Sequence, residues 1–450
     1  MKDKKLFKDS IVVGFALFAT FFGAGNLVFP PIVGLLSGKA WSMGALGLLL
    51  TAIILPVAGM LAVGNSGSDV RCLMVHAHPK FYTISCAVGW FFCSLGTTIP
   101  KVAATTHEVG MKAIFPNLPI EVTLVVFFVL LYFFARQKDS VIDKVGKYLT
   151  PILVVIMAII LIKGIVSPVG TPVEKSYVEN PLTFSMLQGY LIGDLTLGLM
   201  AANIFINTFR SKGYTEKSTK KGTWLAGIVC IVLMFLIYTG LTYVGAQGGS
   251  IYGADVDQTA LLSGMVYHIF GKIGQVLFGL VVAFACLTTG VAVATAIAQF
   301  FEEFLKKKIK YNTLLLIICI VGFVLARTGV ANVISLAGPI FHIVYPPFIV
   351  FTILGLVDRF IPNDGIYKGA VFTALIFGAL DAILMVFPSF TALSAVLSYI
   401  PLFDAGFGWV IPTVIVACIC GVLYRKKERT YFDIATEQVV VGRQNQEEKA

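Results

Sequence analysis

The chain has 450 residues, of which 57% are apolar and only 13% are charged, and its mean hydropathy is +0.88. This composition excludes a soluble globular domain, because such domains carry about 25% charged residues. The formal net charge of +10 is expected of a membrane protein whose basic loops face one side, so we predict no nucleic-acid partner.

Apolar runs long enough to cross a bilayer recur along the whole chain. A helix needs about 20 mostly apolar residues to cross about 30 Å of hydrocarbon, and about twelve runs meet that requirement. Only Arg327–Gly329 separates the ninth run from the tenth, and we divide them because one helix over both would overshoot the bilayer. The predicted spans are 10–36, 41–64, 81–104, 119–135, 145–166, 185–209, 222–246, 273–301, 313–326, 330–356, 368–388 and 405–424.

The placement of Lys and Arg supports this count. Cytoplasmic loops of membrane proteins carry the excess of positive charge, and basic residues here cluster before the first span and after the fourth, sixth, eighth and twelfth. We therefore predict that both termini are cytoplasmic. A single transmembrane domain is expected over residues 1–430, followed by a short polar tail, 431–450, that we predict to be disordered.

The first span contains an unusual stretch, TFFGAGNLVFPP, at residues 20–31. Gly23 and Gly25 disfavour a helix by about 1 kcal/mol each relative to alanine, and Asn26 adds a polar group at membrane depth. Close helix packing and a simple kink are alternative explanations. Since free backbone groups are costly in lipid, we predict a break that faces protein or a water-filled cavity.

A second disturbed helix lies in the sixth span, LQGYLIGDLTLGLMAANIFIN, where the carboxylate of Asp194 follows Gly193. An ionisable residue within the membrane indicates a functional site. The two breaks lie five spans apart, as expected when two halves of five helices have inverted topology. In such folds broken helices bind a substrate carboxylate with their amides and a cation with their carbonyls.

Two adjacent hydroxyls in the eighth span, Thr288 and Thr289, lie among small residues in ACLTTGVAVATAIAQFF. Threonines in membrane helices usually bond back to their own backbone. Beside a broken first helix, however, hydroxyl and carbonyl oxygens together suit a hard monovalent cation. We predict that these two threonines help to bind one.

Other classes of function fit the sequence less well. A membrane enzyme would need clustered His, Asp or Glu, whereas the five histidines are dispersed, so we predict no enzymatic activity and no cofactor. A channel would show a sustained polar pore, and an amino-acid sensor would usually carry a large cytoplasmic domain. The eight cysteines are scattered, and Cys418 and Cys420 are interpreted as small core residues rather than metal ligands.

Four motifs carry a resemblance to a known family over about residues 8–425. GFALFATFFGAGNLVFPPIVGL, GYLIGD, ACLTTGVAVATAIAQFF and YPP closely resemble the bacterial branched-chain amino acid carriers, which are cation-coupled symporters of leucine, isoleucine and valine. The resemblance implies an all-α fold of the leucine-transporter type in the bacterial inner (cell) membrane. It also implies repeats over about 10–166 and 185–356, broken helices 1 and 6, and two extra helices within about 368–424.

The resemblance further implies a site. The amides of Ala24 and Gly25 are expected near the substrate carboxylate, and carbonyls around Tyr190 to Gly193, with Asp194, near its ammonium group. Tyr190 and Phe22 either line an apolar pocket or pack in the core. The expected substrate-binding residues are Phe22, Gly23, Ala24, Gly25, Asn26, Tyr190, Gly193 and Asp194, and the expected sodium ligands are the carbonyls of Ala19, Phe22 and Ala285 with the hydroxyls of Thr288 and Thr289.

Departures from the family pattern leave the substrate and the ion open. The third span reads SLGTTIPKVAATTHE, with Lys101 and Val102 after Pro100 where relatives carry Arg and Thr. We favour Na⁺, because no lysine interrupts the middle of the fifth span. The alternative is a proton-coupled carrier of another small neutral amino acid, with Asp194 and Lys101 as the groups to suspect. No obligate protein partner is evident.

Three further features have interpretations of their own. Asp381 in the eleventh span is expected to have a structural partner, and His342 to be a satisfied core histidine rather than part of a gate. The glycine-rich, acidic segment 245–258 is expected to help form an external lid.

Overall fold

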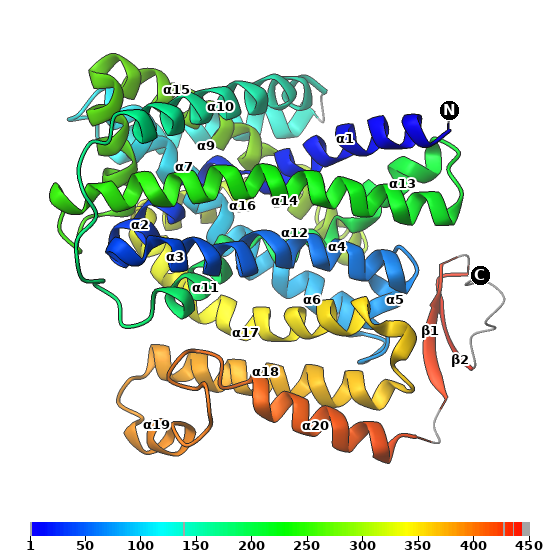
Figure 1. Ribbon diagram of the computed structural model, residues 1–450. Coiled ribbons are helices and arrows are strands. Elements are labelled where there is room, and N and C mark those ends of the chain that lie inside the picture. Colours follow the sequence, from blue (N-terminus) through cyan, green and yellow to red (C-terminus); the bar gives the residue numbers. More distant parts are fainter. Residues whose placement is uncertain (1, 138–139, 426–427, 435, 443–450) are drawn as a thin grey trace.

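The computed structural model describes residues 2–137, 140–425, 428–434 and 436–442, and it is built almost entirely of helices (Figure 1). The helices of the first half are α1 (Lys2–Phe21), α2 (Phe29–Ser37), α3 (Trp41–Leu48), α4 (Leu55–Ser66), α5 (Val70–Met74), α6 (Phe81–Val88), α7 (Ile99–Thr105), α8 (Lys112–Ile114), α9 (Ile120–Gln137) and α10 (Ser140–Val166). Those of the second half are α11 (Pro181–Ile192), α12 (Asp194–Met200), α13 (Ala202–Ser211), α14 (Glu216–Gln247), α15 (Gln258–Phe304), α16 (Tyr311–Ala326), α17 (Val330–Leu356), α18 (Asp364–Val386), α19 (Thr391–Leu397) and α20 (Val410–Leu423).

Shorter elements connect or continue these helices. The 3₁₀ turns are η1 (Ala24–Asn26), η2 (Gly38–Ala40), η6 (Gly248–Ser250) and η7 (Asp358–Phe360), and the π-helical stretches are η3 (Leu49–Ile54), η4 (Gly89–Thr98) and η5 (Thr106–Met111). The π stretches keep the second and third spans continuous, so that α3 and α4, and likewise α6 to α8, act as long single helices.

Every predicted span contains a helix or a run of consecutive helices. Six of these, within the described residues, are long and apolar enough to cross a membrane by themselves, and α16, α20 and residues 151–166 are shorter apolar helices. The predicted division of the ninth from the tenth span is confirmed, because α16 ends at Ala326 and α17 begins at Val330 after Gly329. The chain is a nearly all-helical membrane protein.

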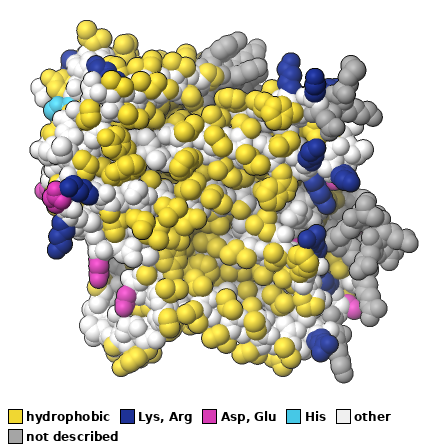
Figure 2. All heavy atoms as spheres, in the orientation of Figure 1, with side chains coloured by type: hydrophobic (Ala, Val, Ile, Leu, Met, Phe, Trp, Pro, Cys, Tyr) yellow, Lys and Arg dark blue, Asp and Glu magenta, His cyan; other side chains and the backbone are white. Residues whose placement is uncertain are grey.

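The surface shows how the bundle meets the lipid. Large apolar side chains such as Val129, Leu236 and Ile273 are more than half exposed, and hydrophobic atoms cover a broad band of the face in Figure 2. Lys and Arg gather at the right-hand end of that view, where α1 begins and the C-terminal strands lie (Figures 1 and 2). The ends of the bundle are polar because charged groups there reach water and headgroups.

Two segments differ from the sequence prediction. The eighth span begins earlier than expected, because residues 258–270 extend α15 toward its N-terminus beyond a kink at Gly271. The tail is not wholly disordered: β1 (Arg429–Asp433) and β2 (Gln438–Gly442) form an antiparallel hairpin. Its aromatic and β-branched residues favour strands, which the overall polarity of the tail concealed.

Close packing of the broken first span fixes its position. A methyl group on Gly34 of α2 would lie 1.8 Å from the carbonyl oxygen of Thr242 on α14. We expect Gly34→Ala to lower the free energy of unfolding by about 3 kcal/mol, the upper range for overpacking, as measured by thermal unfolding in detergent. Gly64→Ala is the matched control, since its nearest neighbour would be the Cδ1 of Ile206 at 3.4 Å. Equal unfolding midpoints for the two variants would contradict this packing.

Candidate functional site

The first span is broken where the sequence predicted it. α1 ends at Phe21, α2 begins at Phe29, and η1 lies between them. In a continuous helix the N–H of Gly23 would bond the carbonyl of Ala19, but it donates instead to the carbonyl of Phe21 at 2.9 Å. Because of the break, the carbonyl of Ala19 does not accept the helical hydrogen bond from the N–H of Gly23.

The sixth span breaks at Gly193, whose φ of +93° and ψ of 0° place it in the left-handed region. Glycine adopts that conformation without strain, and it allows α11 to end at Ile192 and α12 to begin at Asp194. The N–H of Leu195 donates to the hydroxyl of Tyr345 on α17 at 3.2 Å. This bond anchors the start of α12 to the tenth span.

Two other glycines of the sixth span serve packing rather than the break. A methyl group on Gly189 would lie 2.1 Å from the hydroxyl oxygen of Thr51, and one on Gly198 would lie 2.2 Å from the carbonyl oxygen of Pro56. Both glycines thus let the sixth span approach the second span closely. Of the glycines in this segment, Gly193 is the one at the break.

The two breaks meet through side chains. The amide nitrogen of Asn26 donates to both carboxylate oxygens of Asp194, at 3.1 and 3.3 Å, and to the carbonyl of Phe21 at 3.2 Å. The ammonium group of Lys101 donates to the amide oxygen of Asn26 at 3.4 Å. Asn26, Lys101 and Asp194 are all buried, so they form a bridged charge pair between the third and sixth spans, which we call the central triad.

Lys101 also lies against the backbone of the first break. Its ammonium group is 5.2 Å from the centre of the Phe29 ring, as in a cation–π contact, and a methyl group on Gly25 would lie 3.5 Å from its Cε. From the sequence, Lys101 is expected only as an alternative coupling group. A lysine within an apolar run, directly after Pro100, does indicate a functional group. Its partners could not be predicted, because they lie far away in the sequence.

The structure brings the segments that carry the predicted sodium ligands together, and it shows a hydrogen bond between two of these ligands. α15, which carries Ala285, Thr288 and Thr289, lies against η1. The hydroxyl of Thr288 donates to the carbonyl of Ala285 at 2.9 Å, so two of the predicted ligands are bonded to each other. The side chains of Ala19, Thr288 and Thr289 are half-buried.

The two predicted aromatic side chains belong to different ring clusters. Phe22 stacks on Phe18, with ring centres 4.9 Å apart, and lies 6.4 Å from the ring of Tyr238. Tyr190 is fully buried and lies 4.9 Å from the ring of Tyr345. Phe22 therefore flanks the first break, whereas Tyr190 packs between the sixth and tenth spans.

The side chains of His342 and Asp381 pair with each other at the edge of the core. The Nδ1 of His342 bonds the carbonyl of Gly338 at 2.9 Å, and its Nε2 lies 3.6 Å from the carboxylate of Asp381. This is the arrangement expected of a satisfied core histidine and of a structural partner for Asp381.

A polar cavity of about 440 Å³ lies near the start of α15. Its lining comes from the end of the third span and from the beginning of α15, and comprises Glu108, Lys112, Asp257, Thr259, Ala260, Ser263, Gly264 and Gln275. Glu108 accepts from the hydroxyl of Thr259 at 2.7 Å and from the N–H of Val330 at 3.0 Å. Asp257 belongs to the segment 245–258 that is predicted to form a lid, so this segment borders the cavity.

Comparison with known families gives a match over most of the chain. Residues 6–427 match the family described as "Branched-chain amino acid transport protein". The chain is 31% identical over 434 residues to the branched-chain amino acid permease BraB of Bacillus subtilis, covering 94% of this chain and 97% of the relative. It is 30% identical over 424 residues to the permease BrnQ of Escherichia coli K12, covering 92% and 94%.

Solved structures of two transporters share the fold. The inward-facing conformation of Mhp1 aligns with a TM-score of 0.52 at 12% identity, covering 93% of this chain and 91% of that one. MhsT in complex with L-phenylalanine aligns with a TM-score of 0.50 at 15% identity, covering 91% and 96%. The predicted leucine-transporter-type fold is thereby confirmed.

Proposed function

Because the chain belongs to the branched-chain amino acid transport family, we propose that it imports leucine, isoleucine and valine by symport with Na⁺ through alternating access. The observation that carries this proposal is the contact between Asn26 and Asp194, since it joins the two broken helices at one buried point. Broken helices that meet within the membrane supply both free amides and free carbonyls. A zwitterionic amino acid and a cation need both kinds of group, because amides bind the carboxylate and carbonyls bind the positive charges.

We assign the substrate's two charges to the two breaks. The amides of Ala24 and Gly25 bind its carboxylate, where the backbone of the first span is released from helical bonding. The carbonyls between Tyr190 and Gly193 bind its ammonium group, and Asp194 adds a negative charge. Selectivity comes from an apolar surface that includes Phe22 at the first break, and because one methylene is worth only about 1–3 kcal/mol, the three substrates are poorly distinguished.

The cation binds between the first and eighth spans in this proposal. The ligands are the carbonyls of Ala19, Phe22 and Ala285 with the hydroxyls of Thr288 and Thr289, a neutral oxygen shell suited to a hard cation. The released carbonyl of Ala19 and the position of α15 against η1 support this assignment. Binding the cation turns the hydroxyl of Thr288 away from the Ala285 carbonyl, so that both oxygens face the ion.

One observation favours proton coupling as a second candidate. The buried ammonium group of Lys101 lies 3.4 Å from the amide oxygen of Asn26, so a positive charge already occupies the centre of the protein. A proton moving between Lys101 and Asp194 would change the charge of the triad without a sodium ion. In that case the substrate is a small neutral amino acid and uptake follows the pH gradient.

The proposed orientation places both termini in the cytoplasm of a bacterial cell. The basic end of the bundle in Figure 2 then faces the cytoplasm, in agreement with the positive-inside rule. Spans one to five and six to ten form the two inverted repeats, which move relative to each other around the central triad. The cavity beside Glu108 and Asp257 then opens toward the outside.

The two threonines give a direct test of the sodium site. We expect Thr288→Ala combined with Thr289→Ala to raise the Na⁺ concentration for half-maximal leucine uptake by about 10-fold or more, since each lost ligand weakens ion binding by about 1 kcal/mol. The measurement is radiolabelled leucine uptake into proteoliposomes at increasing external Na⁺.

Thr208→Ala is the matched control for this test. Its exposed hydroxyl donates to the carbonyl of Ile204 in the same helix, as that of Thr288 does to Ala285, but it lies away from the break. An unchanged Na⁺ dependence in the double variant would reject the proposed ligand set.

A further inference from the structure

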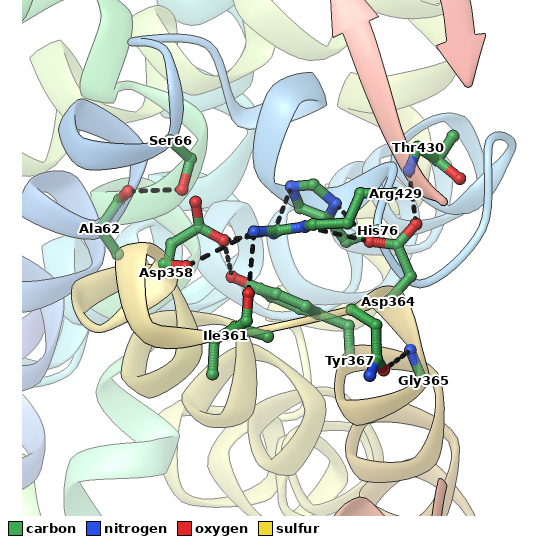
Figure 3. Close-up of polar contacts among 11 residues, drawn as sticks. Ala62, Ser66, His76, Asp358, Ile361, Asp364, Gly365, Tyr367, Arg429 and Thr430 are labelled. Carbon is green, nitrogen blue, oxygen red and sulfur yellow. Dashed lines mark hydrogen bonds and ion pairs between the residues drawn. The ribbon is translucent and has the colours of Figure 1, made fainter. Parts of the chain in front are cut away.

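A buried polar cluster lies at the end of the bundle where the C-terminal strands dock, which is the cytoplasmic end in the proposed orientation (Figures 1 and 3). Asp358 follows α17, Asp364 begins α18, and His76 lies in the connection after α5. Arg429 reaches the cluster from strand β1. The side chains of Asp358, Asp364 and His76 are less than 10% exposed, and that of Arg429 is 13% exposed.

Arg429 holds this cluster together through several donors. Its guanidinium group donates to the Asp358 carboxylate at 2.6 Å and to the Ile361 carbonyl at 3.2 Å, and its Nε lies 3.5 Å from the Asp364 carboxylate. Its Nη2 also lies 3.3 Å from the Nε2 of His76. Since arginine can only donate, that Nε2 accepts, and the Nδ1–H of His76 donates to Asp364 at 2.9 Å.

The electrostatic balance of the cluster depends on Arg429. Burial alone would raise the pKa of Asp358, but the charge and hydrogen bond of Arg429 outweigh it and hold that pKa below its usual range. Without the guanidinium group, the buried carboxylates of Asp358 and Asp364 would lose the arginine charge that pairs with them. The binding of the β1–β2 hairpin to the bundle therefore depends strongly on the Arg429 side chain.

Other contacts between the hairpin and the bundle are fewer and more exposed. The N–H of Thr430 donates to Asp364 at 2.7 Å, and Arg71 of α5 lies 4.6 Å from the centre of the Phe432 ring. Arg71 also pairs with Glu437, which is 71% exposed. Val439, Val440 and Val441 of β2 are at least 40% exposed. A two-stranded hairpin is marginally stable by itself, so the hairpin depends on these contacts with the bundle.

The hairpin connects parts of the bundle that lead to the central site. It joins α5 to the turn between α17 and α18, and α5 follows directly from α4. In turn, α4 packs closely on α12, where Gly59 lies against Leu195 and Leu199. Since α12 begins with Asp194, a shift of α4 relative to α17 would reach the central triad.

We propose that the β1–β2 hairpin is a latch that ties the second span to the tenth and eleventh at the cytoplasmic side and releases in each transport cycle. The inference rests on the proposed function, because it assigns the hairpin a step in alternating access. When Arg429 occupies the cluster, the cytoplasmic ends of α4 and α17 are held together. When the hairpin leaves, the central site opens toward the cytoplasm.

Cys72 is a native reporter of the latch. It is buried under β1, with its sulfur 3.7 Å from the carbonyl of Phe432.

The labelling experiment uses protein that retains Cys72 while the other seven cysteines are replaced by alanine. In this protein we expect Arg429→Gln to raise the rate at which a charged maleimide labels Cys72 by about 10-fold or more, because charge-assisted hydrogen bonds are lost. Glu437→Gln is the control and should change it less than about 2-fold, since exposed ion pairs contribute little. Equal rates for the two variants would overturn the assignment of Arg429 as the anchor.

A cross-link tests whether release is required. Phe432→Cys is introduced into the same protein and joined to Cys72 with a short bis-maleimide in proteoliposomes. We expect leucine uptake to fall about 10-fold or more after cross-linking while leucine binding is retained, because a conformational step is blocked. Uptake unchanged by the cross-link, in a preparation that transports before it, would overturn the latch alone. A preparation that takes up no amino acid under any gradient would overturn the proposed function and the latch together.

Discussion

Replacing Asp194 with asparagine is expected to lower leucine uptake at least about 100-fold, while the protein still inserts in the membrane. The carboxylate lies at the junction of the two breaks and accepts both hydrogen bonds from Asn26. Asparagine keeps the shape but removes the charge that balances Lys101 and that, in the proposed site, attracts the substrate's ammonium group. Losing a charged partner in a buried site costs about 3–5 kcal/mol, which is more than 100-fold in rate or affinity.

The measurement is the initial rate of radiolabelled leucine uptake into proteoliposomes at matched protein content. Asp404→Asn is the control, since Asp404 is an exposed carboxylate between α19 and α20 and should leave the rate unchanged. An Asp194→Asn protein that transports at the original rate would remove Asp194 from the mechanism.

The second large effect concerns stability. Lys101→Met is expected to lower the unfolding midpoint markedly, because it leaves the buried Asp194 without the ammonium group bridged to it through Asn26. Breaking a buried ion pair costs about 3–5 kcal/mol, whereas replacing both partners is often nearly neutral. Lys101→Met combined with Asp194→Asn should therefore unfold close to the original midpoint, although it transports no leucine.

Thermal unfolding in one detergent gives the midpoints of the four proteins: the original, Lys101→Met, Asp194→Asn and the double variant. Recovery of stability without recovery of transport would separate the two roles of the triad, its charge balance and its action on the substrate. If the losses of the single variants simply added in the double variant, Lys101 and Asp194 would not be coupled.

The sequence was sufficient to predict both helix breaks. Glycine and asparagine in an apolar run mark backbone that cannot continue as a helix without cost, so one break was predictable within residues 20–31 and another within the sixth span. Gly189 and Gly198 looked equivalent to Gly193, yet they serve close packing on the second span. Composition does not distinguish a glycine that needs positive φ from one that needs space.

Contacts between distant segments were harder to predict. The link from Lys101 through Asn26 to Asp194 depends on how three spans are arranged, and no local pattern encodes it. The same holds for Arg429, whose partners lie in the connection after α5 and in the turn between α17 and α18. The hairpin itself was missed because its strand-forming residues are few and lie within a polar tail.

The most direct test of the account is radiolabelled leucine uptake into proteoliposomes under Na⁺ and pH gradients imposed separately. The account predicts accumulation of leucine driven by the inward Na⁺ gradient, competition by isoleucine and valine, and little accumulation with the pH gradient alone. Accumulation that ignores Na⁺ and follows only the pH gradient would contradict the sodium site, and no accumulation of any aliphatic amino acid under either gradient would contradict the proposed function.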